Sequence, residues 1–216
     1  WRNKVTSFVN IFSLGVGITA FIFIMLYVHH EISYDKFNVN YDRIYRLEGD
    51  DFAMLPPILG MQVKDKLPEV ENVALLAMNF RNFIGYYPEG HPENMKQIEG
   101  SRFLADSTTF AVFSFPFIQG DPNTALKEPM TVVLTESTAK KLFGDVNPMG
   151  KNVEFEDGPY RVTGIMKDIK SSHIEIDFLM SLSSFAKISP EVDLNRASWA
   201  WSGTYLLMKE GVDEKL

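Results

Sequence analysis

The sequence predicts an α+β protein in which one N-terminal transmembrane helix precedes an extracytoplasmic domain. Residues 8–28, FVNIFSLGVGITAFIFIMLYV, form 21 consecutive positions without a charge. A helix of that length spans about 31 Å, which matches a hydrocarbon core of about 30 Å. The chain that follows interleaves short alternating patterns, typical of strands, with helical ones. These two observations give the fold class, and the flanking charges give the orientation.

Two other kinds of segment share some of these properties and are disfavoured for residues 8–28. A cleaved signal peptide has a shorter apolar region and a small-residue cleavage site, whereas MLYVH follows here. A core helix of a soluble protein is normally shorter and shows a polar stripe. Arg2 and Lys4 precede the helix and no acidic residue occurs before Glu31. The positive-inside rule therefore places the amino terminus in the cytoplasm and the residues after about 30 outside.

One side of this predicted helix carries small and polar residues at spacings of three and four. They are Asn10, Ser13, Gly17 and Ala20. Small residues let helices approach closely, and Asn and Ser can hydrogen-bond across the contact where lipid offers no partner. We expect this side to pack against other transmembrane helices. The alternative is ordinary membrane-helix composition, in which Gly is common.

The composition of the remaining chain limits its function. It carries all 28 acidic residues and, without Arg2 and Lys4, 19 of the 21 basic residues, so its net charge is −9. Such a surface does not attract nucleic acid or anionic lipid. The absence of cysteine excludes disulfides, thiolate zinc sites and thiol nucleophiles. About 186 residues can bury a core in one domain or two small ones.

Local patterns predict the order of the elements after the first helix. A strand, a helix opened by two prolines and a second strand form a βαβ-like opening, and a later strand leads into a helix capped by Thr135 and ended by Gly144. A hairpin is expected around Asp157 and Gly158. The expected strands are 44–48, 73–78, 131–134, 153–156, 160–166 and 199–208, and the expected helices are 56–67 and 136–143. Residues 211–216 read as the start of a truncated helix, so we expect a fragment of a longer protein.

Dense aromatics occupy the segment that follows the second strand. They are Phe103, Phe110, Phe113, Phe115 and Phe117. Either core packing or a partner surface would use such residues, and core packing is favoured.

Candidate chemical sites are few. Residues 144–151 resemble a phosphate-binding loop superficially, but five residues instead of four separate the glycines, Asn152 replaces Ser or Thr, and the segment follows a helix. His173, Glu175 and Asp177 would share one face of a strand and could hold a metal. A half-buried strand with a solvated face gives the same alternation and is favoured. We therefore expect no catalytic residue, no metal site and no cofactor.

Several stretches together resemble one family. They are RNKVTSFVNIFSLGVGITAFIFIMLYVHHEISYDKF, YDRIYRL, VFSFPFIQGDPNTAL, VVLTESTAKKLFGDVNPMGK and YRVTGIMKDIKSSHIEIDFL. In this order they are similar to ABC transporter permeases of the MacB/FtsX type, closest to those of Bacteroidetes-like bacteria, and they cover nearly the whole chain.

The resemblance implies more than the residues alone do. Residues 1–30 would form the cytoplasmic flank and helix, and 31–216 a two-lobed MacB-like periplasmic core domain, with 41–80 and 199–216 in a porter-like lobe and 81–198 in an inserted, strand-rich lobe. It implies a non-enzymatic permease in a bacterial inner membrane that works as a dimer with a separate cytoplasmic ATPase. Coupling ATP hydrolysis to movement of the external domain would be mechanotransmission, for efflux or lipoprotein extrusion. A periplasmic or outer-membrane partner and the cargo are left open.

Two other functions share parts of this pattern. A membrane-anchored extracytoplasmic sensor domain would have the same topology, and the sequence after residue 216 would distinguish it by one more helix and a signalling module. A membrane-anchored hydrolase would require His173, Glu175 and Asp177 to bind metal.

Overall fold

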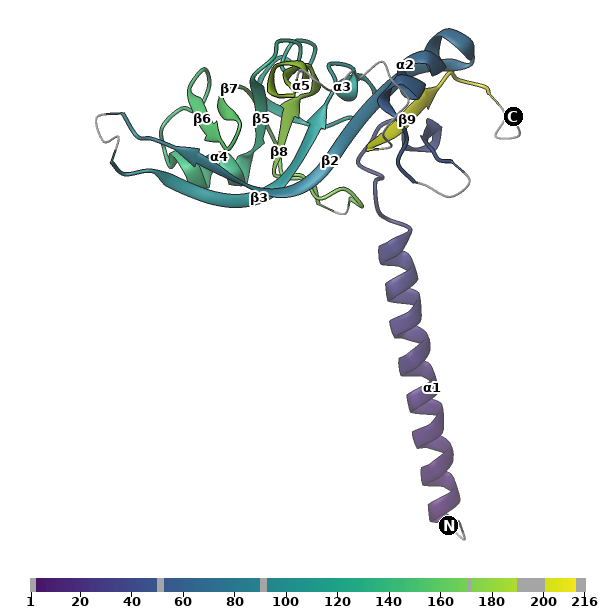
Figure 1. The fold of residues 1–216 in the computed structure, drawn as a ribbon. Helices are drawn as coiled ribbons and strands as arrows, with labels where there is room; N and C mark the ends of the chain where they lie inside the picture. Colours follow the sequence, from purple (N-terminus) through teal and green to yellow (C-terminus); the bar gives the residue numbers. More distant parts are fainter. Residues whose placement is uncertain (1–2, 50–52, 90–92, 171, 190–200, 213–216) are drawn as a thin grey trace. The chain divides into compact units, whose positions relative to one another are not determined.

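The computed structural model describes residues 3–49, 53–89, 93–170, 172–189 and 201–212 of the chain (Figure 1). Contacts divide the chain into two compact units. Unit 1 contains residues 1–36 and 171–173, and unit 2 contains residues 37–170 and 174–216. Each unit is described by itself.

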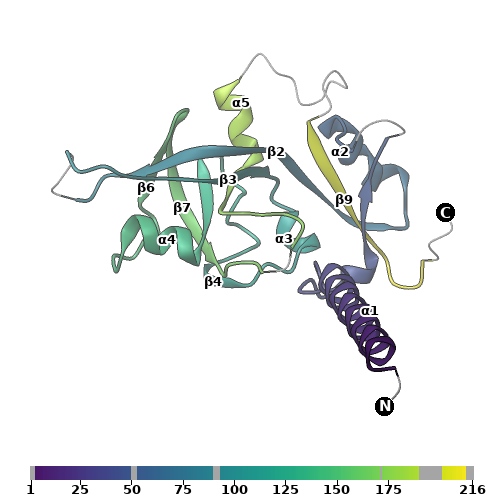
Figure 2. The same cartoon turned by 90° about the horizontal axis from the view of Figure 1, so that it is seen from below.

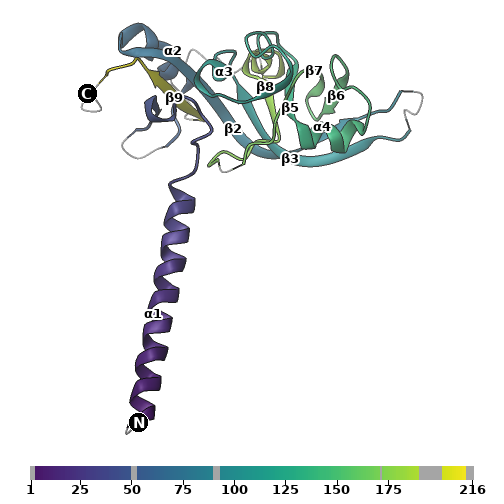
Figure 3. The ribbon, with the colours of Figure 1, turned by 180° about the vertical axis from the view of Figure 1, so that it is seen from behind.

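Unit 1 is dominated by helix α1, Lys4–Glu31 (Figures 1 and 3). It confirms the expected helix and extends it at both ends, because the flanking polar residues are compatible with helical backbone although not with lipid. None of its residues is buried within the chain. Among the described helices, α1 is the one that is long and apolar enough to cross a membrane. An apolar helix without a protein neighbour is what a bilayer environment favours.

In its described residues, unit 2 is built on one nine-stranded sheet with four short helices. The strands run in the order β1-β9-β2-β3-β8-β5-β7-β4, and β6 pairs with both β2 and β7. The strands are β1 (Ile44–Leu47), β2 (Val70–Tyr86), β3 (Lys96–Ala105), β4 (Phe117–Gly120), β5 (Thr131–Thr135), β6 (Asn152–Phe155), β7 (Gly158–Met166), β8 (Phe178–Ser181) and β9 (Ser202–Met208). The helices are α2 (Pro57–Lys66), α3 (Thr109–Val112), α4 (Glu136–Phe143) and α5 (Phe185–Ile188), with single 3-10 turns at Tyr41–Arg43 and Leu182–Ser184.

The beginning of unit 2 is a split βαβ unit. Strands β1 and β2 each pair antiparallel with β9, so they run parallel to each other with β9 between them. Helix α2 connects them and packs against β2 and β9. The βαβ-like opening is therefore confirmed, and the inserted strand comes from the far end of the chain. Figure 2 shows β9 and α2 at one end of β2 and β6 at the other.

Six strands of the sheet form a closed hydrogen-bonded path, which we call the strand ring. The path runs β2-β3-β8-β5-β7-β6 and returns to β2 through the pairing of Gly85 with Glu154. Its interior holds the largest apolar cluster, and a second cluster packs on the outer side. Closing a sheet on itself buries one face of every strand, which gives a short chain a dense core.

A bulge in β2 allows residues from both halves of this strand to pack in the same apolar cluster. Leu75 and Ala77 belong to the inner cluster, and beyond the register shift between residues 77 and 80 the inner residues are Ile84 and Tyr86. The extra residue shifts the alternation of side chains by one position. Odd-numbered residues therefore face inward before the bulge and even-numbered residues after it. The expected strand 73–78 ended where this parity changes. The expected lobe boundary at residue 80 falls inside β2, and the division into two lobes stays a prediction.

Several local predictions are confirmed. Thr135 caps α4 by accepting a hydrogen bond from the Thr138 N–H, and Gly144 ends that helix with φ +64°. Strands β6 and β7 form the hairpin around Asp157 and Gly158. The dense aromatics pack in the outer cluster, either buried or partly buried: Phe103, Phe110, Phe113, Phe115 and Phe117.

Other predictions differ from the structure. Residues 173–177 are not a strand, because β8 begins only at Phe178. The final strand begins at Ser202 rather than at 199, and residues 199–200 lie outside the described residues, as do residues 213–216 of the expected terminal helix.

Candidate functional site

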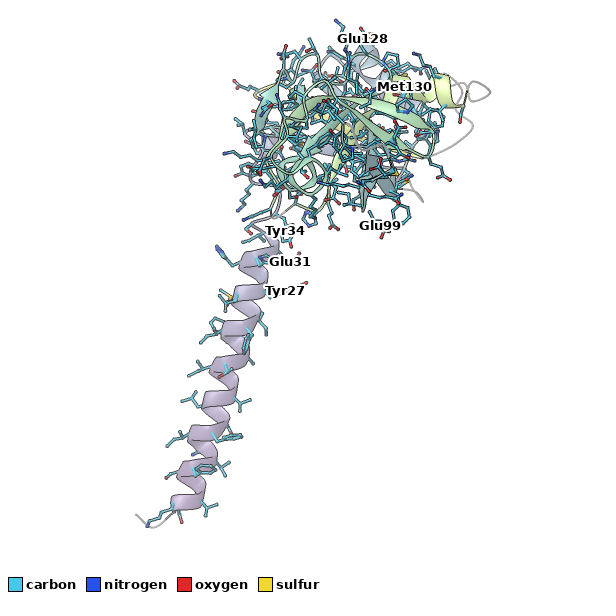
Figure 4. All side chains as sticks on the ribbon, turned by 90° about the vertical axis from the view of Figure 1, so that its left-hand side faces the viewer. Tyr27, Glu31, Tyr34, Glu99, Glu128 and Met130 are labelled. Carbon is cyan, nitrogen blue, oxygen red and sulfur yellow. The ribbon has the colours of Figure 1, made fainter. Side chains whose placement is uncertain are left out.

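The candidate functional site lies in unit 1, just beyond the carboxyl end of α1. It consists of Tyr34, Asp35, Ser172 and His173, which we call the stalk junction. Figure 4 labels Tyr34 after the last turn of the helix, with Tyr27 and Glu31 on the turns before it. Two of the four residues follow the helix, and the other two come from a distant segment of the chain. Ser172 and His173 lie 137 and 138 positions after Asp35 in the sequence.

Asp35 is the centre of the junction. Its Oδ1 accepts a hydrogen bond from the Ser172 hydroxyl at 2.7 Å and one from the His173 N–H at 3.3 Å. Its Oδ2 lies 2.8 Å from Nδ1 of His173. One carboxylate therefore binds two side chains and one backbone group of the second segment, which fixes both the position and the orientation of that segment.

The backbone at Asp35 has a left-handed conformation, with φ +58°. Among residues with a side chain, Asp and Asn tolerate this region best, because their short polar groups can hydrogen-bond locally. The chain thus turns sharply after α1 at a residue whose carboxylate is also the hydrogen-bond acceptor of the junction. Alanine at this position would lose the hydrogen bonds and be strained as well.

Aromatic rings extend the junction back to the last turn of α1. The Tyr34 ring lies 4.7 Å from the His173 ring and 5.0 Å from the His30 ring, measured between centroids. The Tyr34 hydroxyl is 3.1 Å from Nε2 of His30. The same tyrosine therefore contacts the helix and the second segment at once. His30 belongs to the polar end of the helix, His29–Glu31, and contributes to the junction through this ring contact.

The second segment has a particular place in the chain. Residues 172–173 lie between β7, which ends at Met166, and β8, which begins at Phe178. Both strands belong to the strand ring of unit 2. In the sequence, unit 1 therefore continues into unit 2 at two places, after residue 36 and on either side of residues 171–173.

The first residues of unit 2, which follow residue 36, have contacts of their own inside that unit. The Phe37 ring stacks on that of Phe115 at 5.9 Å. The Asn38 Oδ1 accepts a hydrogen bond from the Ser114 N–H at 3.0 Å, and the Val39 N–H donates one to the Ser114 hydroxyl at 3.0 Å. Asn38 is buried although polar, which indicates a satisfied structural role.

The structure places the three metal candidates in different environments. His173 lies in the junction, 2.8 Å from Asp35. Glu175 is exposed. Asp177 belongs to the sheet: its Oδ2 accepts a hydrogen bond from the Ser101 N–H at 2.8 Å. Across the parts of the chain that the structure describes, no group of three His, Asp or Glu side chains is arranged to hold a metal ion.

The expected helix packing face remains a prediction. All of α1 is exposed within the chain, and a Cβ added at Gly17 would meet nothing within 4 Å. The neighbouring Thr19 donates its hydroxyl hydrogen bond to the Gly15 carbonyl at 2.8 Å, so it needs no partner from another helix. Asn10, Ser13 and Ala20 have the exposure that a packing face requires.

Sequence reasoning singled out His173 for a metal and missed Asp35, Tyr34 and Ser172. No periodic pattern connects two segments so distant in sequence, because periodicity reports only on neighbours within one element. The one local signal was an aspartate in the turn that follows a long helix, because Asp tolerates a left-handed backbone better than most residues.

The chain is similar in sequence to known proteins of one family. The sequence profile for the "MacB-like periplasmic core domain" matches residues 7–216. The macrolide export ATP-binding/permease protein MacB of Neisseria gonorrhoeae is 29% identical over 72 residues, which is 33% of this chain and 11% of that protein. MacB of Neisseria meningitidis serogroup B gives the same values. The chain matches only about a tenth of the length of these relatives.

Solved structures share the fold. A domain assigned to a permease protein from Porphyromonas gingivalis has a TM-score of 0.67 at 22% identity, covering 82% of this chain and 79% of that one. The periplasmic region of MacB from Actinobacillus actinomycetemcomitans has a TM-score of 0.56 at 18% identity, with 79% and 75% covered. The extracellular domain of the ABC-type transporter YknZ from Gram-positive bacteria has a TM-score of 0.51 at 17% identity, with 78% and 83% covered.

Proposed function

Because the chain belongs to the family of MacB-like periplasmic core domains, we propose that it is the membrane-anchored, extracytoplasmic part of an ABC transporter permease subunit. In this function α1 crosses the inner membrane with its amino terminus in the cytoplasm, and unit 2 lies in the periplasm. The chain performs no chemistry. It converts a movement made by a cytoplasmic ATPase into a movement of the external domain, either for efflux or for extrusion of a lipoprotein.

The stalk junction is the observation that supports this proposal most directly. A passive anchor needs one flexible connection, whereas Asp35 binds the chain between β7 and β8 through three hydrogen-bonding contacts. Two routes from one helix into one domain transmit rotation as well as pulling, because a second attachment point removes the free swivel of a single bond.

The junction is also suited to repeated movement. His173 and Asp35 are well exposed, with side-chain exposures of 62% and 40%. Exposed ion pairs and hydrogen bonds contribute only about 0.2–1 kcal/mol each, so they can rearrange without unfolding the domain. Coupling through the stalk junction requires that the junction has two distinct conformations, and that the ATPase shifts the equilibrium between them.

The proposal names three partners: a cytoplasmic ABC ATPase, a second copy of the permease, and the lipid bilayer. The first test is purification of the full-length permease from its own membrane. We expect an ATPase encoded nearby to co-purify with a dimeric permease. A permease isolated without any ATPase, under conditions that preserve other ABC complexes, would contradict the proposal.

The second test measures coupling itself. The chain has no cysteine, so Lys127→Cys gives a single exposed label in each copy of unit 2. In the full-length complex in nanodiscs, we expect the spin–spin distance between the two copies to change when ATP is added. Asp35→Ala should reduce that change while ATP hydrolysis continues.

A matched control separates coupling from a general loss of charge. Asp145→Ala removes an exposed carboxylate that pairs with Lys140 at the end of α4. That variant should keep the full ATP-dependent distance change. Equal distance changes in the unmodified and Asp35→Ala complexes would show that the junction does not carry the coupling.

A further inference from the structure

An apolar stripe is exposed on the outer side of the hairpin that β2 and β3 form in unit 2. It consists of Phe83, Tyr87 and Met95, which are 55%, 45% and 38% exposed, and we call it the hairpin stripe. Ile84 and Tyr86 belong to the inner cluster of the strand ring, so the odd-numbered positions around them face away from the ring. The solvated face of an antiparallel pair is normally polar. Figure 1 shows this hairpin extending beyond β6.

Gly85 makes the stripe continuous. Phe83 and Tyr87 lie two positions to either side of this glycine, on the same face of the hairpin. A Cβ added at Gly85 would clash with the methyl group of Met95. The Met95 side chain therefore lies across the glycine, which is buried although it faces outward. The three apolar side chains consequently form one surface, and an exposed apolar surface with a polar rim is typical of an interaction site.

Two carboxylates flank the hairpin stripe, and the register of the sheet fixes their places. Glu99 of β3 pairs with Phe83, and Glu154 of β6 pairs with Gly85 at the other edge of β2. Directly paired residues project from the same face, with Cβ atoms about 4.5–5.5 Å apart. Glu99 is exposed and Glu154 is half-buried. Within the described residues neither carboxylate takes part in an ion pair, so both can bind a cation from outside.

The spacing of the carboxylates limits what can cover the stripe. Glu99 and Glu154 lie two strand spacings apart across the sheet and two residues apart along it, which is about 12 Å. Residues seven positions apart in a helix share one face and are about 10.5 Å apart, and long basic side chains bridge the difference. An extended segment could span a similar distance, but its backbone groups would lie unpaired against apolar side chains. A helix satisfies these groups internally and is therefore favoured.

The charges exclude two other occupants. A second copy of the chain would bring the carboxylates of both copies around one apolar contact, where like charges repel. The acidic domain does not attract anionic lipid. We propose that the hairpin stripe docks a basic amphipathic helix of a partner protein, with Lys or Arg residues seven positions apart beside Glu99 and Glu154 and apolar residues between them. The proposal does not depend on the transport function.

Two synthetic peptides test this proposal on the full 216-residue chain in zwitterionic nanodiscs. The Lys peptide is an alanine-based helix with two Lys residues seven positions apart and Leu at the third and fourth positions after the first Lys. The Glu peptide has Glu in place of both Lys residues. Fluorescence anisotropy of the labelled peptides, titrated against empty nanodiscs as well, measures binding. The Lys peptide should bind saturably, and the Glu peptide about tenfold more weakly or worse, because two attractive charge pairs become repulsive.

Variants locate the site. Phe83→Ser removes the exposed ring and should weaken binding of the Lys peptide about tenfold. Glu99→Lys combined with Glu154→Lys should reverse the preference, so that the Glu peptide binds more tightly than the Lys peptide. Glu128→Lys is the matched control, because Glu128 is also exposed and Figure 4 labels it at the opposite end of unit 2 from Glu99. It should leave binding of the Lys peptide unchanged.

The outcomes are decisive. If the double variant does not fold, Glu99→Lys alone decides, because it should bring the affinities of the two peptides close together. The proposal is overturned if the Lys peptide shows no saturable binding beyond that to empty nanodiscs, or if both peptides bind the unmodified chain equally. Unchanged binding to a folded Phe83→Ser chain overturns it as well. Weaker dimerisation of the full-length Phe83→Ser permease in analytical ultracentrifugation would identify a second copy as the occupant, which also overturns it.

Discussion

Helix α1 and the strand ring contain similar apolar residues but bury them in opposite ways. No residue of α1 is buried within the chain, whereas Phe178, Leu134 and Tyr160 in the ring are fully buried. The ring therefore obtains its stability from its own side chains. The apolar residues of α1 need a bilayer or another helix to cover them. The same kind of substitution should consequently affect folding in one region and assembly in the other.

The largest effect is expected from truncating a ring aromatic. Phe178 is 0% exposed and contacts the ring of Phe155 with 5.2 Å between centroids. Phe178→Ala should lower the free energy of unfolding by about 3–5 kcal/mol, because it leaves a cavity in a core that cannot collapse. Denaturant unfolding followed by fluorescence measures this. Phe21→Ala in α1, where the side chain is 61% exposed, should change the same transition by less than about 0.5 kcal/mol.

The second effect concerns a glycine in the sheet. Gly120 ends β4 with φ +91°, and an added Cβ would lie 2.4 Å from the Thr163 carbonyl oxygen. Gly120→Ala should cost about 1–3 kcal/mol through backbone strain and this clash. The measurement is again the unfolding transition. An unchanged midpoint would show that β4 can move away from β7 without loss.

The third effect tests the opposite behaviour in the helix. Gly17 has open space around it within the chain. Gly17→Leu should leave unfolding of the strand-rich domain unchanged and weaken dimerisation or ATPase binding of the full-length permease, because Leu prevents close helix approach. Analytical ultracentrifugation in detergent measures assembly. If the Gly17→Leu permease assembles as well as the unmodified permease, the predicted packing face formed with Asn10, Ser13 and Ala20 is contradicted.

The smallest effect is a pH dependence of the domain. Burial raises the pKa of Asp106 above its usual value, although hydrogen bonds from Thr109 and Thr108 oppose the shift. The folded state therefore holds this proton to higher pH than the unfolded state. The stability that this proton contributes is fully present below the pKa of Asp106 in the unfolded state. It is lost as the pH rises through the pKa of Asp106 in the folded state.

The variant Asp106→Asn should abolish this component, because an amide does not titrate in this range. Relative to the variant, the unmodified chain should lose stability as pH rises just above the usual aspartate range. Urea unfolding of both proteins at several pH values, from about 3 to about 7, measures the difference. Parallel pH profiles for the two proteins would contradict the assignment to Asp106.

Local patterns predicted much of the fold correctly. The span of α1, the proline-opened α2, the cap and stop of α4 and the hairpin around Gly158 all follow from residues that are neighbours in sequence. Each depends on backbone preferences or on a short apolar period, which a single sequence displays directly. The expected strand over 73–78 was too short because the bulge in β2 interrupts the alternation that reveals a strand.

The candidate sites could not be predicted in the same way. Asp35 and His173 meet across 138 positions of the sequence. His173, Glu175 and Asp177 alternate as a strand would, yet the segment is not a strand and its residues have separate environments. Alternation cannot distinguish a solvated strand face from a loop that is held by distant contacts.

By itself, the sequence determined that this protein has an apolar membrane-length helix, an acidic α+β domain without cysteine, and a family resemblance carried by several ordered segments. Only the tertiary structure decided that β9 inserts between β1 and β2, that six strands close into a ring, and that Asp35 binds the chain between β7 and β8. The reason is physical. Chain-local preferences act between neighbours, whereas sheet order and side-chain pairing are selected by burial of the whole core.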